Sequence, residues 1–130
     1  MQDMIDRIDH FVLTVRSLDE SCRFYQQVLG FERVDAPGRP TAVRFVSQKI
    51  NLHEVGRTFE PKAAVPMPGA GYFCLITRRR IEDVLAHLAE HGVAVELGPV
   101  ERNGAQGRMI SVYFRDPDRN LVEVSCYLPA

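Results

Sequence analysis

The chain has no tryptophan, only three cysteines and no excess of charge of either sign. Its 16 Lys and Arg residues and 17 Asp and Glu residues leave a net charge of −1, which gives no attraction to nucleic acid or an anionic membrane. The longest apolar runs are only as long as a strand, so none can span a bilayer, and no secretory signal is visible. We therefore expect neither nucleic acid nor a membrane as a partner.

The cysteines form no recognisable metal or redox motif. Cys22, Cys74 and Cys126 are odd in number, lack CxxC or zinc-knuckle spacing, and each lies among apolar residues. This is typical of reduced thiols that pack in the core of a cytoplasmic protein. The sequence also lacks a glycine-rich phosphate loop, a GxSxG elbow and a Cys–His dyad, so no nucleotide or serine-hydrolase site is indicated.

The chain contains an internal repeat, in which one pattern of secondary structure occurs twice within a single domain, residues 1–130. In the first copy, residues 5–55, a strand rich in β-branched residues is expected over 8–15. It precedes a capping box formed by the side chains of Ser17 and Glu20. A helical apolar stripe then ends at Gly30. The strands expected after it cover residues 31–34, 42–46 and 49–55.

A connection rich in proline and glycine, residues 56–69, separates the copies. The second copy, residues 70–128, repeats the pattern of one strand, one helix and three strands. The strands are expected over 72–77, 93–97, 109–114 and 120–127, and the helical stripe runs from Ile81 to Leu88. Two such βαβββ modules predict an α+β fold in which the sheets form a cup.

The second copy is longer than the first, and its additional residues are expected after its helix. Gly30 and Gly92 are 62 residues apart, whereas His53 and Glu123 are 70 apart, which implies about eight additional residues. The polar, glycine-bearing segment 99–108 is the expected location, and we predict that it is a loop that can close over a site.

His10, His53 and Glu123 lie where strand alternation would direct their side chains to one face. Two imidazoles and a carboxylate are a suitable ligand set for a divalent metal, with positions left open for substrate. Each residue also has a structural alternative. His10 could be a hydrogen-bonded core histidine, His53 could lie at a solvated edge, and Glu123 could pair with Lys or Arg. Burying an unpaired carboxylate costs several kcal/mol, so Glu123 carries the strongest signal.

Tyr72 occupies the position in the second copy that His10 occupies in the first. It is either a weak ligand, a hydrogen-bond donor to substrate or an aromatic wall, and a phenol with a pKa near ~10 favours the last two roles. We assign catalytic roles to Glu123 and Tyr72. The expected substrate pocket is lined by Arg44, Tyr72, Cys74, Ser125 and Tyr127.

His87 and His91 are four residues apart on the second helix. Without the glutamate of an HExxH motif this is a weak zinc signal, and we expect two surface histidines near the helix C-terminus.

Several motifs together resemble the vicinal oxygen chelate superfamily, which includes glyoxalase I, extradiol dioxygenases and proteins of fosfomycin and bleomycin resistance. They are the opening strand IDHFVLTV, the helix SLDESCRFYQQVLGF and the closing segment YFRDPDRNLVEV. Segment 98–125 is similar to glyoxalase-domain proteins described as virulence-associated or dioxygenase-related. The resemblance covers residues 5–127.

The resemblance implies paired βαβββ modules around a metal ion, with ligand positions on the first and last strands of each module. These positions map onto His10, His53, Tyr72 and Glu123, of which Tyr72 departs from the family pattern. The implied function is that of a metalloenzyme of lyase, isomerase or dioxygenase type. It would use one Fe, Mn, Ni or Zn ion to chelate a small substrate through vicinal oxygens.

Two other functions stay open at this stage. A metal-free drug-binding protein of the bleomycin-resistance type would use the cup as an aromatic pocket, although the aromatic content is only 8%. A structural or regulatory module would have vestigial ligands. The family resemblance also implies a homodimer, in which the modules can be exchanged between chains.

Overall fold

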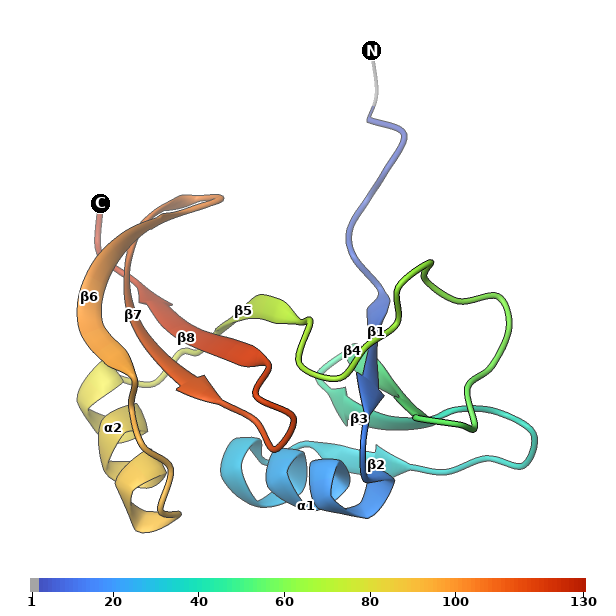
Figure 1. Cartoon of the computed structure of the whole chain (residues 1–130). Helices are drawn as coiled ribbons and strands as arrows, with labels where there is room; N and C mark the ends of the chain where they lie inside the picture. The colour runs from blue at the N-terminus through green and yellow to red at the C-terminus, as the bar shows by residue number, and fades with distance from the viewer. Residues whose placement is uncertain (1–2) are drawn as a thin grey trace. The chain divides into compact units, whose positions relative to one another are not determined.

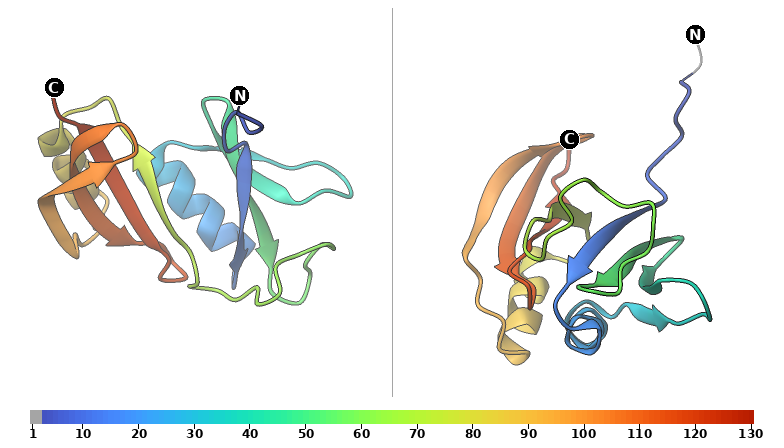
Figure 2. Two further views of the ribbon diagram at one scale, coloured as in Figure 1. Left: turned by 90° about the horizontal axis from the view of Figure 1, so that it is seen from above. Right: turned by 45° about the vertical axis from the view of Figure 1, so that its right-hand side comes forward.

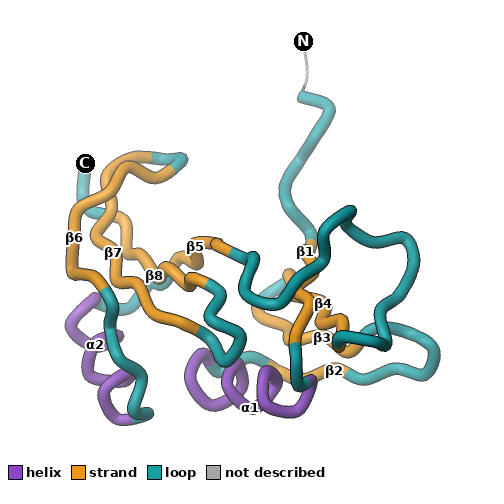
Figure 3. The backbone as a smooth tube through the Cα atoms, viewed as in Figure 1, coloured by secondary structure: helices purple, strands orange, loops and turns teal. Residues whose placement is uncertain are grey.

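The computed structural model describes residues 3–130 and contains two compact units, the first ending at Pro68 and the second running from Gly69 to Ala130. Each unit consists of one strand, one helix and three further strands (Figures 1 and 3). The strands of each unit form a four-stranded mixed sheet. The predicted α+β fold with two βαβββ copies is therefore confirmed.

The first unit has its opening and closing strands side by side. Its sheet has the order β1-β4-β3-β2, in which β1 is parallel to β4 and the other pairs are antiparallel. The parallel pairing requires a crossover, which α1 provides. The elements are β1 (His10–Val15), α1 (Leu18–Leu29), β2 (Glu32–Val34), β3 (Thr41–Phe45) and β4 (Gln48–Glu54).

The ends of α1 follow the predicted signals. The Ser17 hydroxyl accepts a hydrogen bond of 3.2 Å from the backbone N–H of Glu20. Gly30 ends the helix with a φ of 72°, a left-handed conformation that favours glycine. The helix packs against β2, β3 and β4 (Figure 2). It buries Cys22, Tyr25 and Val28.

The second unit repeats this arrangement. Its sheet has the order β5-β8-β7-β6, with β5 parallel to β8, and α2 packs against β7. No helix within residues 3–130 is long and apolar enough to cross a membrane. The elements are β5 (Tyr72–Ile76), α2 (Ile81–Glu90), β6 (Leu97–Gly104), β7 (Gly107–Arg115) and β8 (Leu121–Tyr127).

The predictions of a strand over 93–97 and a closing loop over 99–108 are wrong. Residues 97–104 form β6, which continues into β7 as a long, curved hairpin (Figure 1). Val100 pairs with Ser111, and Gly104 pairs with Gly107 across a two-residue turn. No residue of β6 is buried, and several of them are polar, so this strand has the composition of a loop.

The turn before β8 positions that strand. The Asp116 carboxylate accepts hydrogen bonds from the backbone N–H groups of Asp118 and Asn120, at 3.0 and 2.9 Å. The side chain of Asn120 in turn accepts a 2.7 Å hydrogen bond from the N–H of Gly71, just before β5. The turn therefore joins the beginnings of β5 and β8, on which Tyr72 and Glu123 lie.

Candidate functional site

The second unit has one apolar and one polar sheet face. Val112, Phe114 and Val122 alternate on one face and are fully buried. The opposite face presents hydroxyl, thiol and carboxylate groups, because paired residues of neighbouring strands point to the same side. By register, this polar face contains Tyr72, Cys74, Arg102, Ser111, Tyr113, Glu123 and Ser125.

Glu123 is the buried anion of this face, with 4% of its surface exposed. The Tyr72 hydroxyl donates to its Oε1 at 3.1 Å, and the Ser125 hydroxyl donates to its Oε2 at 3.2 Å. No Lys, Arg or His within residues 3–130 forms a salt bridge with it. Hydroxyls alone only partly compensate the desolvation of a carboxylate, so this site would bind a cation favourably.

Ser125 connects Glu123 to two further donors. Its oxygen lies 2.6 Å from Ser111 Oγ and 3.2 Å from Cys74 Sγ. Because the single Ser125 proton is directed to Glu123, the serine and the thiol act as donors to Ser125. Burial raises the pKa of Cys74, which keeps this thiol protonated. Cys74 is exposed, unlike the buried Cys22, so the prediction of a core packing role for it is wrong.

Tyr72 is 63% exposed, although its hydroxyl is held by Glu123. Hydrogen bonding with Tyr113, together with desolvation and the neighbouring Glu123 carboxylate, raises the pKa of Tyr72 to about 12. The phenol is therefore protonated at neutral pH and acts as a hydrogen-bond donor. These properties favour the donor role over a role as metal ligand.

Sequence reasoning missed Tyr113 and Arg102. The Tyr113 ring lies 6.4 Å from the Tyr72 ring, and Arg102 Nε donates to the Tyr113 hydroxyl at 3.0 Å. Arg102 also places its guanidinium 5.6 Å from the centre of the Tyr113 ring, within cation–π range. The alternation of Met109, Ser111 and Tyr113 could have identified Tyr113, but Arg102 lay in the segment interpreted as a loop.

Tyr127, another predicted pocket residue, has its hydroxyl bound to the β6–β7 turn. It accepts a hydrogen bond of 3.1 Å from the backbone N–H of Gln106, in the β6–β7 turn. Tyr127 therefore holds the hairpin tip, four residues beyond Glu123 on β8.

The first unit has an equivalent face, formed by alternate residues of β1, β4 and β3. It includes the predicted residues His10, Arg44 and His53, and also Asn51. Asn51 and His53 are 9% and 5% exposed, and within residues 3–130 Asn51 Oδ1 and His53 Nδ1 have no hydrogen-bond partner. Unpaired buried polar atoms are costly, and a bound ion or ligand is one explanation for them.

His53 is electrically neutral at physiological pH. Burial lowers its pKa, and the positive charge of Lys62 lowers it further. The ring lies 5.5 Å from the ring of Phe59. A neutral imidazole retains the lone pair that metal binding requires.

His10 is more exposed, and its orientation is set by Asp9. The ring Nδ1 lies 2.7 Å from Asp9 Oδ1. A carboxylate only accepts, so Nδ1 carries the proton and Nε2 presents the lone pair when the ring is neutral. Metal-bound histidines are oriented by carboxylates in this way.

The strand registers correct one inference from sequence. His10 and Tyr72 each open the first strand of their unit. Opposite these strands, Asn51 pairs with Val12, and Glu123 pairs with Cys74. Asn51 is therefore the counterpart of Glu123, whereas His53 is the counterpart of Ser125.

The prediction that His53 and Glu123 occupy matching positions is consequently wrong. Matching positions are 72 residues apart (123−51), so ten additional residues lie in the second unit rather than eight. His53 pairs with Thr14, four residues beyond His10. At about 3.3 Å per residue this is roughly 13 Å along the sheet, so Asn51 is the nearer neighbour of His10.

Comparison with known proteins finds relatives that match nearly the whole chain. The model of the Glyoxalase/Bleomycin resistance protein/Dioxygenase superfamily matches residues 7–124. Virulence protein STM3117 of Salmonella typhimurium is 48% identical over 98% of this chain and 89% of its own, and its crystal structure has a TM-score of 0.94. A glyoxalase domain-containing protein, RDO1 of Mycosarcoma maydis, is 46% identical over 95% of this chain and 69% of its own.

More distant relatives have different described activities. Catechol-2,3-dioxygenase of Bacillus subtilis is 28% identical over 90% of this chain, which spans 40% of that enzyme. The structure of lactoylglutathione lyase from Agrobacterium tumefaciens is 25% identical, covers 94% of both chains and has a TM-score of 0.72. TnmS3 of Streptomyces sp. CB03234, an antibiotic binding protein, is also 25% identical, covers 98% of this chain and all of its own, and has a TM-score of 0.74.

Proposed function

The chain belongs to the Glyoxalase/Bleomycin resistance protein/Dioxygenase superfamily, and from this premise we propose that it is a divalent-metal-dependent enzyme. Its substrate would be a small molecule that chelates the metal through neighbouring oxygens. The observation that carries the proposal is Glu123, a buried carboxylate that has hydroxyl partners but no cationic partner in the described part of the chain, residues 3–130.

Each unit contains side chains of the kind that bind a divalent ion. Glu123 supplies carboxylate oxygens, and His10 has an Nε2 lone pair because Asp9 holds Nδ1. Asn51 Oδ1 and His53 Nδ1 are buried polar atoms without a hydrogen-bond partner within residues 3–130. A mixed set of nitrogen and oxygen ligands suits Fe, Mn, Ni or Zn.

We propose His10 and Glu123 as metal ligands, with the third ligand supplied either by His53, as the sequence predicts, or by Asn51, which lies nearer to His10. The register makes Asn51 a competing candidate for the position of His53. A bound ion would supply Lewis-acid chemistry to adjacent substrate oxygens.

The residues around Glu123 position it and provide the hydrogen-bond donors. Ser125, supported by Ser111 and Cys74, holds one carboxylate oxygen, and Tyr72 holds the other. Tyr72 stays protonated and exposed, so it can donate to a substrate oxygen while Glu123 binds the ion or accepts a substrate proton. Tyr113 supports Tyr72, and Arg102 supports Tyr113.

Metal binding by variants of the full chain tests this proposal. Metal-stripped protein would be reconstituted with Mn(II), Fe(II), Ni(II) or Zn(II), and the bound metal measured by elemental analysis and calorimetry. Glu123→Gln and His10→Gln should each weaken binding at this site by at least about tenfold. Arg44→Gln, on the same polar face, is the matched control and should leave the affinity unchanged.

Asn51→Ala and His53→Ala decide the third ligand, because only the variant that removes a ligand should weaken binding. No binding after reconstitution, or unchanged binding in both Glu123→Gln and His10→Gln, would exclude the metal-dependent function.

The reaction class depends on the metal. Iron or manganese in protein from its native host would favour dioxygenase chemistry, as in the catechol-2,3-dioxygenase relative. Nickel or zinc would favour an isomerase or lyase of the lactoylglutathione lyase type.

A second candidate function is supported by an aromatic pair in which Tyr72 is exposed and Tyr113 is buried. Tyr72 and Tyr113 lie 6.4 Å apart, with Arg102 beside Tyr113, and could bind a planar ligand without a metal. TnmS3 is an antibiotic binding protein with a similar fold. If Tyr72→Ala abolishes binding of an aromatic ligand to metal-stripped protein while Glu123→Gln does not, this alternative replaces the enzyme.

The proposal includes a cytoplasmic homodimer. The three cysteines are free, as expected in a reducing compartment. Light scattering coupled to size exclusion would measure the mass, and a monomer at micromolar concentration would contradict the dimer.

A further inference from the structure

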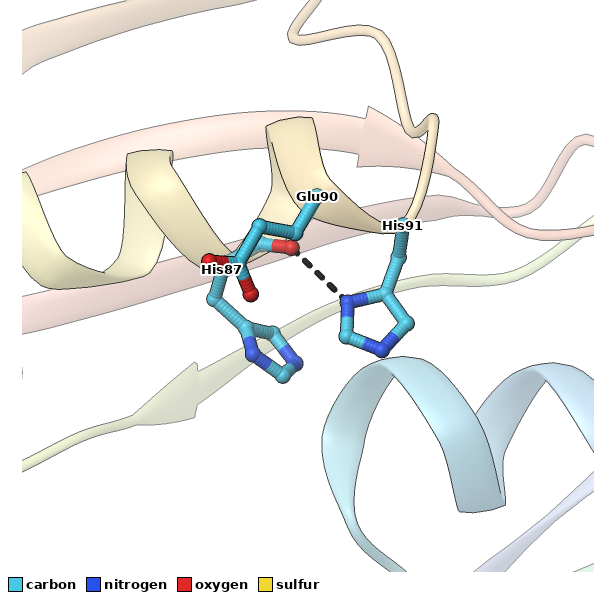
Figure 4. Close-up of side chains that lie close together, drawn as sticks. All are labelled: His87, Glu90 and His91. Carbon is cyan, nitrogen blue, oxygen red and sulfur yellow. Dashed lines mark hydrogen bonds between the residues drawn. The ribbon is translucent and has the colours of Figure 1, made fainter.

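The C-terminal end of α2 brings together three metal-ligating side chains, none of which is assigned to the site proposed above. His87, Glu90 and His91 lie at spacings of three and four residues, which place them on one side of the helix (Figure 4). One ligand atom from each side chain lies within 4.8 Å of the others. The imidazole rings are 4.3 Å apart between centres. Donor atoms around a four-coordinate zinc ion are roughly 3.3 Å apart, so small side-chain rotations would suffice for binding.

The His91 ring is already oriented for coordination. Its Nδ1 lies 2.9 Å from the backbone carbonyl oxygen of His87, which can only accept a hydrogen bond (Figure 4). The proton is therefore on Nδ1, and Nε2 is the lone-pair nitrogen of the neutral ring. Histidines that bind metals are commonly held by a carbonyl in this way, which reduces the entropy lost on binding.

The charges at this end of the helix favour a cation. The unpaired carbonyls at a helix C-terminus carry partial negative charge. Glu90 adds a carboxylate, is exposed, and forms no ion pair with any residue from 3 to 130. Gly92 follows with a φ of 68°, so the chain leaves the helix directly after His91.

We propose that His87, Glu90 and His91 form a metal site that binds one borderline divalent ion, Zn(II), Ni(II) or Cu(II). Two imidazole nitrogens and one carboxylate oxygen are the ligands that these ions accept most readily at a protein surface. Water completes the coordination. This site is independent of the one around Glu123 and does not require the proposed enzyme function.

The four histidines of the chain permit a direct test by NMR. Zn(II) would be titrated into the metal-stripped full chain while the ring nitrogens are observed. His87 and His91 report on the α2 site, whereas His10 and His53 report on the proposed enzyme site. The expected result is a shift of the His87 and His91 nitrogens that saturates at one ion, and that persists when Glu123→Gln removes the other site.

Substitutions then identify the ligands. His91→Gln and Glu90→Gln should each weaken Zn(II) binding at this site by at least about tenfold. Glu82→Gln removes the same charge from the first turn of α2 and should leave the affinity unchanged. Equal weakening by Glu82→Gln and Glu90→Gln would indicate an adventitious ion only, attracted by net charge, and would overturn the proposal. Unshifted His87 and His91 nitrogens at saturating Zn(II) would also overturn it.

Discussion

The polar faces of the two units are formed by equivalent strands, but they differ in how far their buried polar groups are hydrogen-bonded. In the second unit, both Glu123 oxygens accept hydrogen bonds, and Ser125, Ser111 and Cys74 continue the network. In the first unit, the counterpart positions hold Asn51 and His53, each with one buried atom that lacks a partner among the described residues, 3–130. One copy thus presents a pre-organised anion, while the other presents unsatisfied neutral polar atoms.

This difference indicates how the two copies could divide a common task. A hydrogen-bond network fixes the position of a carboxylate before any ligand arrives. Unpaired neutral acceptors, in contrast, gain most from a ligand, because binding ends their desolvation cost. Two substitutions and a change of pH test this difference between the two faces.

Ser125→Val should have the largest effect. It removes the donor to Glu123 Oε2 and leaves the buried Ser111 hydroxyl without its acceptor. We expect the free energy of unfolding of the metal-free protein to fall by about 2–4 kcal/mol. Urea denaturation followed by circular dichroism measures this change. His53→Gln, at the counterpart position, should lower it less because His53 Nδ1 has no bond to lose. Equal losses would mean that the two faces do not differ as described.

Asn51→Leu should have a smaller effect of opposite sign. The substitution removes a buried oxygen that has no donor, in a side chain of similar size. The free energy of unfolding of the metal-free protein should rise by about 1 kcal/mol, measured in the same urea assay. Asn103→Leu on the exposed β6 hairpin is the control and should change stability by less than about 0.5 kcal/mol. A loss of stability in Asn51→Leu would show that Asn51 is already satisfied.

The acid dependence of stability should show the smallest effect. The pKa of His53 is below its ordinary value of 6.5, chiefly through burial. Below pH 6.5 the unfolded chain therefore binds more protons at this position than the folded chain. The contribution of His53 is present above pH 6.5 and is lost as the pH falls through the folded pKa.

Unfolding of the metal-free protein between pH 5 and pH 7.5 checks this dependence. His53 should contribute less than ~1.4 kcal/mol per pH unit to the slope of the free energy of unfolding against pH, because ~1.4 kcal/mol corresponds to the uptake of one full proton. His53→Gln should reduce the slope only in the acid part of the range. Identical pH profiles for the two proteins would show that His53 is not desolvated.

Local signals were sufficient to predict most of the fold. Ser17 and Gly30 mark the ends of α1 because capping and left-handed conformation depend only on neighbouring residues. β6 was missed, since an exposed hairpin can satisfy its backbone by pairing while its side chains stay polar. Composition alone does not separate such a strand from a loop.

The chain sequence by itself determined that the unit is repeated, where the helices lie, and that His10, His53, Tyr72 and Glu123 are on strands with a polar face. The pairing register decided which of these positions correspond. Side chains alternate with a period of two, so Asn51 and His53 lie on the same face whichever is aligned with Glu123. A shift of two residues in the correspondence between the units can be detected only from the hydrogen-bonded strand pairing. This pairing makes Asn51 the counterpart of Glu123.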